Sequence, residues 1–298
     1  GQPMALTSAQ SGENYRNWWP HPVMKAFTDA SIDLMEDLSR VTDNRLNMSR
    51  RGYALATRAT NIDALQAELA YGYGNEYETQ VRVFEGRSTD AYKRPLHADW
   101  NSAPDGVDIL RGAGLIQEVF PSYADDIQTV IHIRRAGAVD GQQMGQIMLE
   151  RFRAAGGQRR LAEVTNIGKA GGFELTLRPG DAKADSLRAV RIVNAAGPFL
   201  GRIAGMLGSA LPVTTVLQQK IAFEDTDGAI PRAMPFSIDL DGQQIDWTDE
   251  DRDHLSEDPD HAWLAGEMPG AIHCRPDGGD RGTWIKIGWA YNEAPSEP

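Results

Sequence analysis

Residues 189–198 limit the possible architecture more than any other segment of the chain. An apolar run at residues 189–194 predicts a strand, and three very small residues and a proline follow within 195–198. Proline is favoured in the first turn of a helix, so the chain is expected to pass from this strand through a tight turn into a helix. In open α/β sheets, ligands bind at such carboxyl ends of strands. On its residues alone, this turn is as compatible with a structural role as with a ligand contact.

The elements predicted before and after this turn indicate an α/β organisation. Apolar residues at helical spacing predict helices at residues 22–40, from Asn61 onward, and from Asp140 to the glycine pair at 156–157. Residues 87–108 are rich in turn signals and are expected to form a surface loop. Runs of β-branched and aromatic residues predict further strands at 52–57, 161–167, 173–177 and 283–289. Alternation of helices and strands of this kind is typical of α/β proteins.

Composition excludes several classes of protein. The 298 residues suggest one large or two modest domains, at roughly 150 residues per domain. A net charge of −12 argues against a nucleic-acid surface, and no apolar run approaches the roughly 20 residues that span a membrane. The single cysteine rules out a disulfide framework. We therefore expect a soluble, cytoplasmic protein that binds neither nucleic acid nor membrane, with the acidic residues 224–260 forming a solvated excursion.

The common catalytic signatures are absent from the sequence. There is no G-x-S-x-G elbow, no phosphate-binding G-x-x-x-x-G-K-[ST] loop and no H-E-x-x-H pair. No G-x-G-x-x-G turn follows an early strand. His254 and His261 lie in the acidic stretch without metal-ligand spacing, so no metal site is expected, and Cys274 is expected to be a small buried residue.

Six segments carry more specific patterns, and they follow one another in a fixed order. They are the small polar loop at 8–16, R-G-Y-A-L at 51–55, A-V-D-G at 138–141, E-V-T at 163–165, the segment 191–205 with V-N-A-A-G, and K-I-G-W at 286–289. Together they resemble, across nearly the whole chain, the family of FAD-dependent oxidoreductases that includes D-amino-acid oxidase, glycine oxidase and sarcosine oxidase. The resemblance implies FAD as the cofactor.

The resemblance also implies roles for individual residues. Lys286 would face the flavin and assist its reaction with oxygen through a fixed positive charge, whereas an ordinary strand lysine would face water. Arg16 would neutralise charge at the flavin edge or meet a substrate carboxylate; a loop ion pair is the alternative. Trp19 and Arg275 would contact substrate. The residues that would bind the cofactor are Ser8, Gln10, Ser11, Gly12, Val164, Asn194, Ala195, Ala196 and Gly197.

The family resemblance implies a division into two domains. Residues 1–60 and 140–210 would be remnants of the FAD-binding domain with its central helix, and residues 61–139 and 211–298 would form the substrate domain. The expected fold is mixed α/β (α+β), with a mixed, largely antiparallel sheet and flanking helices. Relative to the family, the chain lacks the initial G-x-G-x-x-G unit and the last segment that covers the flavin, so we expect weak FAD binding by this chain alone.

The expected activity is oxidation of a C–N bond in an amino acid or a secondary amine, of the sarcosine or glycine kind. A hydride would pass to FAD, and oxygen or another acceptor would then take the electrons. Two alternatives remain open at this point. One is a cofactor-free module that binds a partner through the acidic residues 246–260, and the other is a flavoenzyme that acts on a 2-hydroxy acid.

Overall fold

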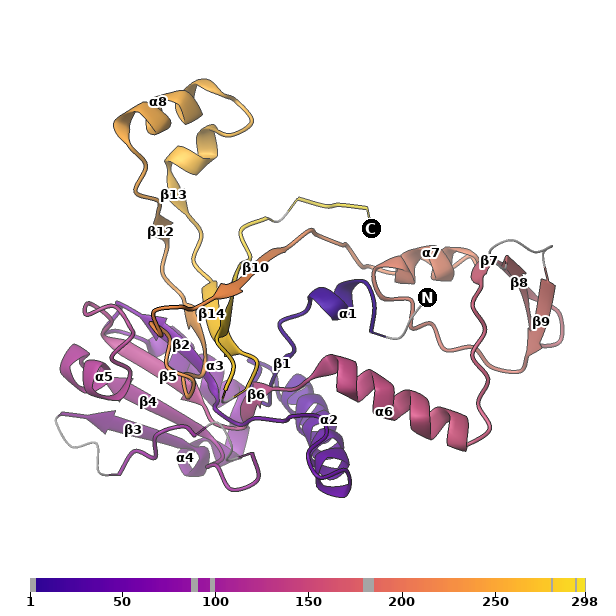
Figure 1. Cartoon of the computed structure of the whole chain (residues 1–298), viewed down its shortest axis with the longest axis horizontal. Coiled ribbons are helices and arrows are strands. Elements are labelled where there is room, and N and C mark those ends of the chain that lie inside the picture. Colours follow the sequence, from indigo (N-terminus) through magenta and orange to yellow (C-terminus); the bar gives the residue numbers. More distant parts are fainter. Residues whose placement is uncertain are drawn as a thin grey trace. The chain divides into compact units, whose positions relative to one another are not determined.

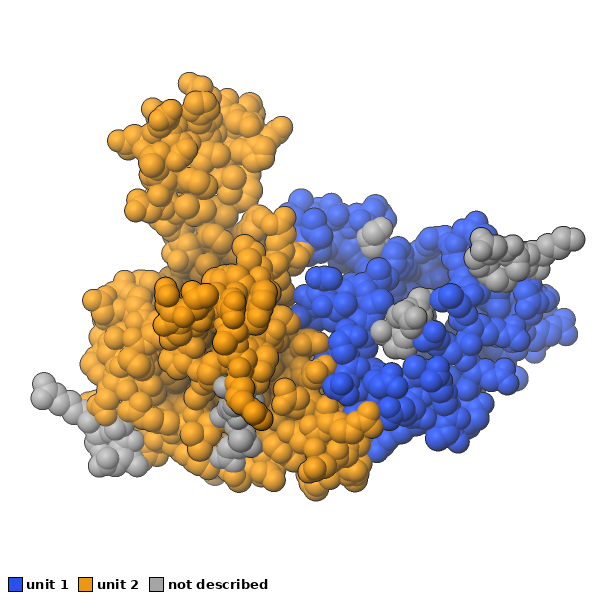
Figure 2. Space-filling model, in the orientation of Figure 1, with its two compact units in different colours: residues 1–11, 141–217, 292–298 blue, residues 12–140, 218–291 orange. Residues whose placement is uncertain are grey.

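The structure is a computed structural model that describes residues 4–86, 91–96, 100–178, 185–279, 281–292 and 294–297. The chain divides into two compact units (Figure 2). Unit 1 comprises residues 1–11, 141–217 and 292–298, and unit 2 comprises residues 12–140 and 218–291. Residues 12–60, which we expected to group with the FAD-binding remnants, therefore lie within the larger unit 2.

Unit 2 is built on one sheet of eight strands, in the order β10-β15-β14-β11-β2-β5-β4-β3. The β11–β2 and β3–β4 pairs are parallel and the remaining pairs are antiparallel, which confirms the mixed, largely antiparallel sheet. The strands are β2 (Tyr53–Thr57), β3 (Val81–Glu85), β4 (Val107–Arg111), β5 (Thr129–Ile133), β10 (Gln219–Glu224), β11 (Phe236–Asp239), β14 (Ile272–Asp277) and β15 (Trp284–Trp289).

Helices and a small ribbon complete unit 2 (Figure 1). The long helix begins as its sequence predicts, because Pro22 occupies its first turn and the His21 side chain accepts a hydrogen bond from the backbone N–H of Val23. Among the described residues, no helix is long and apolar enough to cross a membrane. These elements are α2 (Pro22–Val41), α3 (Asp63–Tyr73), η1 (Gly74–Glu76), α4 (Tyr77–Gln80), α5 (Ala113–Val119), and the ribbon of β1 (Asn14–Arg16) with β6 (Ala136–Ala138).

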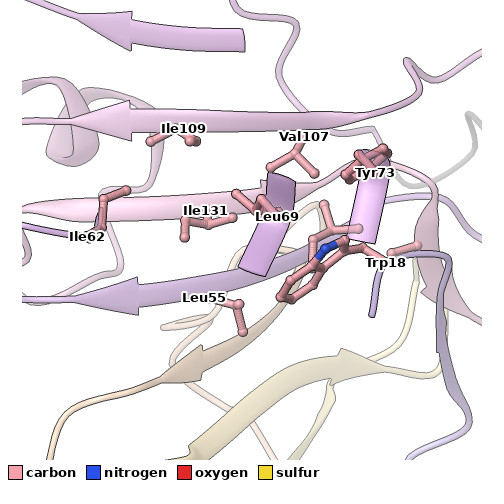
Figure 3. Close-up of a cluster of buried hydrophobic side chains, with 10 residues drawn as sticks. Trp18, Leu55, Ile62, Leu69, Tyr73, Val107, Ile109 and Ile131 are labelled. Carbon is pink, nitrogen blue, oxygen red and sulfur yellow. The ribbon is translucent and has the colours of Figure 1, made fainter. Parts of the chain in front are cut away.

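The two faces of the large sheet pack against different helices. We call face A the face that carries Leu55, Ile109 and Ile131, which pack with Leu69 of α3 and with Trp18 (Figure 3). Face B carries the alternate residues, which pack against α5: Ala54, Ala56, Leu110 and Val130 with Leu115, Ile116 and Val119. Because side chains alternate along a strand, each strand contributes to both cores.

The acidic stretch is only partly an excursion from the fold. Residues 241–270 project from the sheet as an arm, and its helix α8 has no buried residue (Figure 1). The expectation fails for residues 236–239, because they form β11, a central strand that pairs with both β2 and β14. The elements of the arm are β12 (Gln243–Gln244), α8 (Asp249–Glu257), η3 (Ala262–Ala265) and β13 (Glu267–Met268).

Unit 1 combines short helices with a three-stranded antiparallel sheet. The predicted helix after Asp140 is present as α6, and the predicted hairpin is present as β7 and β8. The elements are α1 (Thr7–Gln10), α6 (Gly141–Ala154), β7 (Glu163–Lys169), β8 (Phe173–Arg178), β9 (Asp185–Ala189), η2 (Gly197–Phe199) and α7 (Leu200–Gly205).

The strand predicted at residues 189–194 does not form. Strand β9 ends at Ala189, and residues 190–196 have no regular secondary structure. Val190 and Val193 are 88% and 87% exposed. An apolar run becomes a strand only where a neighbouring strand satisfies its backbone groups, and within the described part of unit 1 no strand pairs with these residues.

Two predicted loops also differ from the structure. Residues 8–16 are not one loop, because Thr7–Gln10 form a helical turn and Asn14–Arg16 pair with β6. The expected surface loop at residues 87–108 ends earlier than predicted, since β4 begins at Val107, whose side chain is fully buried. Residues 87–90 and 97–99 of that prediction lie outside the described residues.

Candidate functional site

On face A, the side chains beyond β2 are charged or aromatic instead of aliphatic, and this region is the candidate site. In the register of the antiparallel strands β10, β15 and β14, Lys220, Gly288 and His273 lie side by side. The next row on the same face contains Ala222, Lys286 and Arg275, and the one after it contains Glu224, Trp284 and Asp277. Charged and ring side chains here occupy positions that hold aliphatic residues near β4 and β5.

Two cations in this region share two carboxylates. The Arg275 guanidinium lies 2.9 Å from Asp277 Oδ1 and 3.8 Å from Glu13 Oε2. The Lys286 ammonium lies 3.4 Å from the other oxygen of Asp277 and 3.9 Å from Glu13. Arg275 is only 5% exposed, and its Nε has no hydrogen-bond partner among the described residues. A buried donor without a partner is costly, so this Nε is suited to an additional polar ligand.

Lys220 and His273 form a hydrogen-bonded pair next to this cluster. Lys220 Nζ lies 3.0 Å from His273 Nε2, and His273 Nδ1 lies 3.0 Å from the carbonyl oxygen of Ala271. The carbonyl can only accept, which assigns the ring proton to Nδ1 and leaves Nε2 to accept from the ammonium. Burial and the neighbouring Lys220 charge lower the pKa of His273. Desolvation and the charges of Arg275 and Lys286 lower the pKa of Lys220.

A glycine makes room for the histidine ring. A Cβ added to Gly288 would lie 2.3 Å from His273 Nε2, which is far inside a normal contact distance. A Cβ added to Gly12, at the start of unit 2, would lie 3.5 Å from Lys220 Nζ, which is an ordinary contact distance. The absence of a side chain at Gly288 is therefore what allows the lysine and the histidine to meet.

Arg16 lies in an aromatic environment at the other end of the site. Its guanidinium carbon is 4.3 Å from the centre of the Trp19 ring and 4.7 Å from that of Tyr53. These are cation–π distances. Arg16 makes no ion pair with a carboxylate among the described residues. It lines a cavity of 360 Å³, together with Trp19, Tyr53 and Phe236.

A row of rings connects the two ends of the site. The ring centres of Tyr53 and Phe236 are 4.5 Å apart, and those of Phe236 and His273 are 5.1 Å apart. The row crosses β2, β11 and β14 on face A, with Arg16 at one end and Lys220 at the other. Sequence reasoning missed Tyr53, Phe236, His273 and Lys220 as site residues. Their alternation along each strand could have assigned them to a face, but only the strand register shows that they are neighbours.

The predicted site residues fall into two groups. Unit 2 contains the predicted catalytic residues Lys286 and Arg16, the predicted substrate contacts Trp19 and Arg275, and Gly12. Lys286 is not a lysine that simply faces water, because it pairs with Glu13 and Asp277. Unit 1 contains Ser8, Gln10, Ser11, Val164, Asn194, Ala195, Ala196 and Gly197.

The turn at residues 194–197 in unit 1 is held by local hydrogen bonds. Asn194 Nδ2 donates to the carbonyl of Leu200 at 3.0 Å, and Asn194 Oδ1 accepts from the backbone N–H of Ala196 at 3.4 Å. Gly197 has a φ of +58°, a conformation that favours glycine. These contacts account for the turn as a structure, and its role in binding a cofactor stays a prediction.

A second cavity, on face B, contains the cysteine. It has a volume of 230 Å³ and an apolar lining that includes Cys274, Ile287 and Met234. Burial raises the pKa of Cys274 to about 11, so the thiol is protonated at neutral pH. Cys274 was expected to be a small buried residue, and in the structure it is only partly buried. Face B has its own ion pairs, since Asp108 of β4 pairs with Arg82 and Arg134, but none of these three residues lines this cavity.

Fold and candidate site together define a mixed α/β protein whose large sheet carries charged and aromatic side chains on one face. The sequence model of the family described as FAD dependent oxidoreductase matches residues 4–281. The chain belongs to this family, whose cofactor is FAD. No curated protein sequence matches the chain.

Solved structures with the same fold agree with the family. The chain is similar to glycine oxidase from Geobacillus kaustophilus (14% identity, TM-score 0.54, 96% of this chain and 60% of that one). It is also similar to L-proline dehydrogenase from P. horikoshii (10% identity, TM-score 0.62, 97% of this chain and 62% of that one). A third similar structure is iminodiacetate oxidase from Chelativorans sp. BNC1 (17% identity, TM-score 0.50, 88% of this chain and 56% of that one). The chain thus spans about three fifths of the length of the first two structures. At these identities the likeness shows the fold.

The residues of unit 2 fit a flavin in chemical terms. A flavin gains negative charge when it is reduced, and face A offers the Lys286 ammonium and the buried, unpartnered Nε of Arg275. A Cβ added to Gly12 would lie 2.8 Å from the Asn14 amide nitrogen, so polar side chains already surround this glycine. The ammonium and the guanidinium are both hydrogen-bond donors suited to an anionic ring, and the carboxylates of Glu13 and Asp277 balance their charges.

Proposed function

We propose that this chain forms part of an FAD-dependent enzyme that oxidises a C–N bond in an amino acid or a secondary amine of the sarcosine or glycine kind. The observation that carries the proposal is the unpaired Arg16 in its aromatic cavity, on the same sheet face as the Lys286 cluster. An unpaired guanidinium in a cavity is suited to a substrate carboxylate, and a nearby fixed cation is suited to a reduced cofactor. Family membership supports the type of reaction.

FAD supplies the acceptor for the hydride from the substrate carbon next to nitrogen. On this chain, we assign its binding to Gly12 and Lys286 in unit 2 and, in unit 1, to Ser8, Gln10, Ser11, Val164, Asn194, Ala195, Ala196 and Gly197. The Lys286 ammonium, oriented by Asp277 and Glu13, provides a fixed positive charge. Such a charge stabilises developing negative charge without reorganisation of solvent.

The substrate is positioned by Arg16 and the rings around it. The guanidinium binds the substrate carboxylate, while the rings of Trp19 and Tyr53 hold the guanidinium in place. Arg275, which is buried and already shares two carboxylates, supports the opposite side of the site. Oxygen or another acceptor would take up the electrons from the cofactor.

The test is flavin retention followed by turnover. The natural protein at its full length, and this chain, are mixed with FAD, freed of excess cofactor and examined by visible absorption. Sarcosine, glycine and proline are then added without oxygen, and bleaching of the flavin band is recorded. We expect retention and bleaching in the full-length protein. If it holds no flavin, or if no amine bleaches it, the proposal is wrong.

Two variants locate the roles of the cations. Lys286→Met should slow reoxidation by oxygen far more than it changes the thermal unfolding midpoint, because its charge acts on the cofactor. Arg16→Met should raise KM for amino acids while leaving amines without a carboxylate unaffected. Arg40→Met, which removes an exposed pair with Asp37, is the matched control and should change neither quantity.

A further inference from the structure

The charges on face A of unit 2 do not balance. Arg275 and Lys286 share the carboxylates of Glu13 and Asp277, so this group is neutral. Lys220 has no carboxylate within ion-pair distance among the described residues, and the same is true of Arg16. Two uncompensated cations remain on one face of a chain whose net charge is −12. Their position, and not the overall composition, makes this face attractive to anions.

Lys220 has hydrogen-bonding capacity to spare. Its ammonium has three N–H donors, and one of them is directed to His273 Nε2. His273 cannot neutralise the lysine, because its ring is held as the neutral tautomer by Ala271 and lies in a setting that lowers its pKa. The charges of Arg275 and Lys286 also lie near Lys220 and disfavour its protonated form. An anion placed on Lys220 would therefore relieve repulsion and use its free donors.

The two unpaired cations are spaced for a ligand with two ends. Arg16 lies over Tyr53 of β2, and the Lys220 ammonium lies at His273 of β14. The strand β11 separates β2 from β14, and His273 is offset from Tyr53 by two residues along the strands, so these two residues lie diagonally across the sheet, roughly 12 Å apart. Between them lie the rings of Tyr53, Phe236 and His273, which offer an apolar surface to a connecting chain.

We propose that this face selects substrates with two carboxylates, one bound by Arg16 and the other by Lys220, and that the substrate class is an amino acid whose nitrogen or side chain carries a second carboxylate at the end of a short chain. The proposal rests on the function proposed above, since it names the substrate of the same site. It makes Lys220 a specificity-determining residue, and it makes His273 the residue that positions it.

Dicarboxylates test this without turnover. Succinate, glutarate and adipate are titrated into the protein by calorimetry and by NMR, alongside acetate and butyrate. We expect the best dicarboxylate to bind roughly tenfold more tightly than butyrate, because the second end forms a charged hydrogen bond. Lys220→Met should abolish this difference and leave butyrate affinity unchanged. Lys220→Arg should preserve much of it, and Lys169→Met, an exposed lysine of unit 1, should have no effect.

The pH dependence gives a second readout. The preference for dicarboxylates should decline as the pH rises through the lowered pKa of Lys220, below the range where an ordinary lysine deprotonates. The charged and titratable groups that face Lys220 are Arg275, Lys286 and His273, and burial keeps the His273 ring neutral over this range because its pKa is lowered. In Lys220→Arg, which keeps its charge, the preference should not decline.

Equal affinities for dicarboxylates and monocarboxylates in the unaltered protein would overturn the proposal, as would an equal loss of both in a folded Lys220→Met protein. These outcomes are distinct from failure of the proposed function. If the protein oxidises simple amino acids and shows no preference for dicarboxylates, the proposed function holds and the proposed substrate class is wrong. If it binds dicarboxylates through Lys220 and retains no flavin, the dicarboxylate site holds and the proposed function is wrong.

Discussion

The two ends of face A belong to the same sheet, yet one end carries buried apolar side chains and the other carries charged and ring side chains. Toward β4 the face is closed, with Val107 and Ile109 fully buried beneath α3 and Trp18 (Figure 3). Toward β10 the same pleat presents Lys286 and His273, and in the described part of unit 2 no helix packs over them. Burial of apolar surface supplies most of the stability of a fold, so the closed end should hold unit 2 together. The open end is then available for binding chemistry.

Removing one apolar side chain from each end of the sheet, Ile109 on face A and Ile221 on face B, should separate these contributions most sharply. Ile109→Ala removes a fully buried side chain at the closed end and should lower the free energy of unfolding by about 2–5 kcal/mol. Ile221→Ala, on β10, removes a side chain that is 64% exposed and should cost no more than about 0.5 kcal/mol. Urea denaturation followed by tryptophan fluorescence measures both. Equal losses would mean that stability is not concentrated at the closed end.

A change at the open end should affect stability less and ligand binding more. Gly288→Ala places a Cβ 2.3 Å from His273 Nε2, so the ring must move away from Lys220. We expect a loss of about 1–3 kcal/mol in stability from overpacking, together with weaker dicarboxylate binding. Gly114→Ala, in α5, meets no atom within 4 Å and serves as the control that should leave binding unchanged. Normal binding by a folded Gly288→Ala protein would show that the position of the ring does not matter.

The rim of the sheet beside β11 should contribute a smaller, pH-dependent effect. Asp241 is partly buried, which by itself raises its pKa, but hydrogen bonds from the Thr57 hydroxyl and from Arg58 outweigh this and leave the pKa lowered. A carboxyl whose pKa is lower in the folded state contributes stability at neutral pH, and the contribution is lost as the pH falls through that value.

Asp241→Asn should therefore weaken the protein by about 1 kcal/mol at neutral pH, and the difference from the unaltered protein should shrink in acid. Urea midpoints at neutral pH and near pH 3 provide the measurement. Asp37→Asn, which alters an exposed pair with Arg40, is the control and should show little difference at either pH. A difference that grows in acid would contradict the assignment.

Local patterns predicted the elements well where the neighbours are close in sequence. Helix α2, the β7–β8 hairpin and β15 follow from spacing, capping and alternation. The predicted strand at residues 189–194 failed because its apolar pattern describes a buried strand without supplying the neighbour that would bury it. Whether a segment forms a strand depends on a second strand that pairs with it, and the sequence of the segment alone does not show whether that second strand is present.

The site shows the same limit. Resemblance to the family pointed to Arg16, Trp19, Arg275 and Lys286, all of which lie in unit 2. It could not point to Lys220 and His273, whose meeting depends on the register of β10, β15 and β14 and on a glycine between them. Contacts that depend on strand register therefore emerge only from the structure, while residues within a local motif can be proposed from the sequence.

The smallest expected effect concerns Cys274, which lies on β14 between His273 and Arg275 but points to face B. Its pKa of about 11 keeps the thiol protonated, so alkylation by iodoacetamide near neutral pH should be roughly a hundredfold slower in the folded protein than in urea. Dicarboxylates bound on face A should not change this rate, because alternate side chains of a strand face opposite sides of the sheet. If a dicarboxylate slows the alkylation of Cys274, binding on face A changes the surroundings of a side chain on face B. The two faces would then be less independent than the strand register implies.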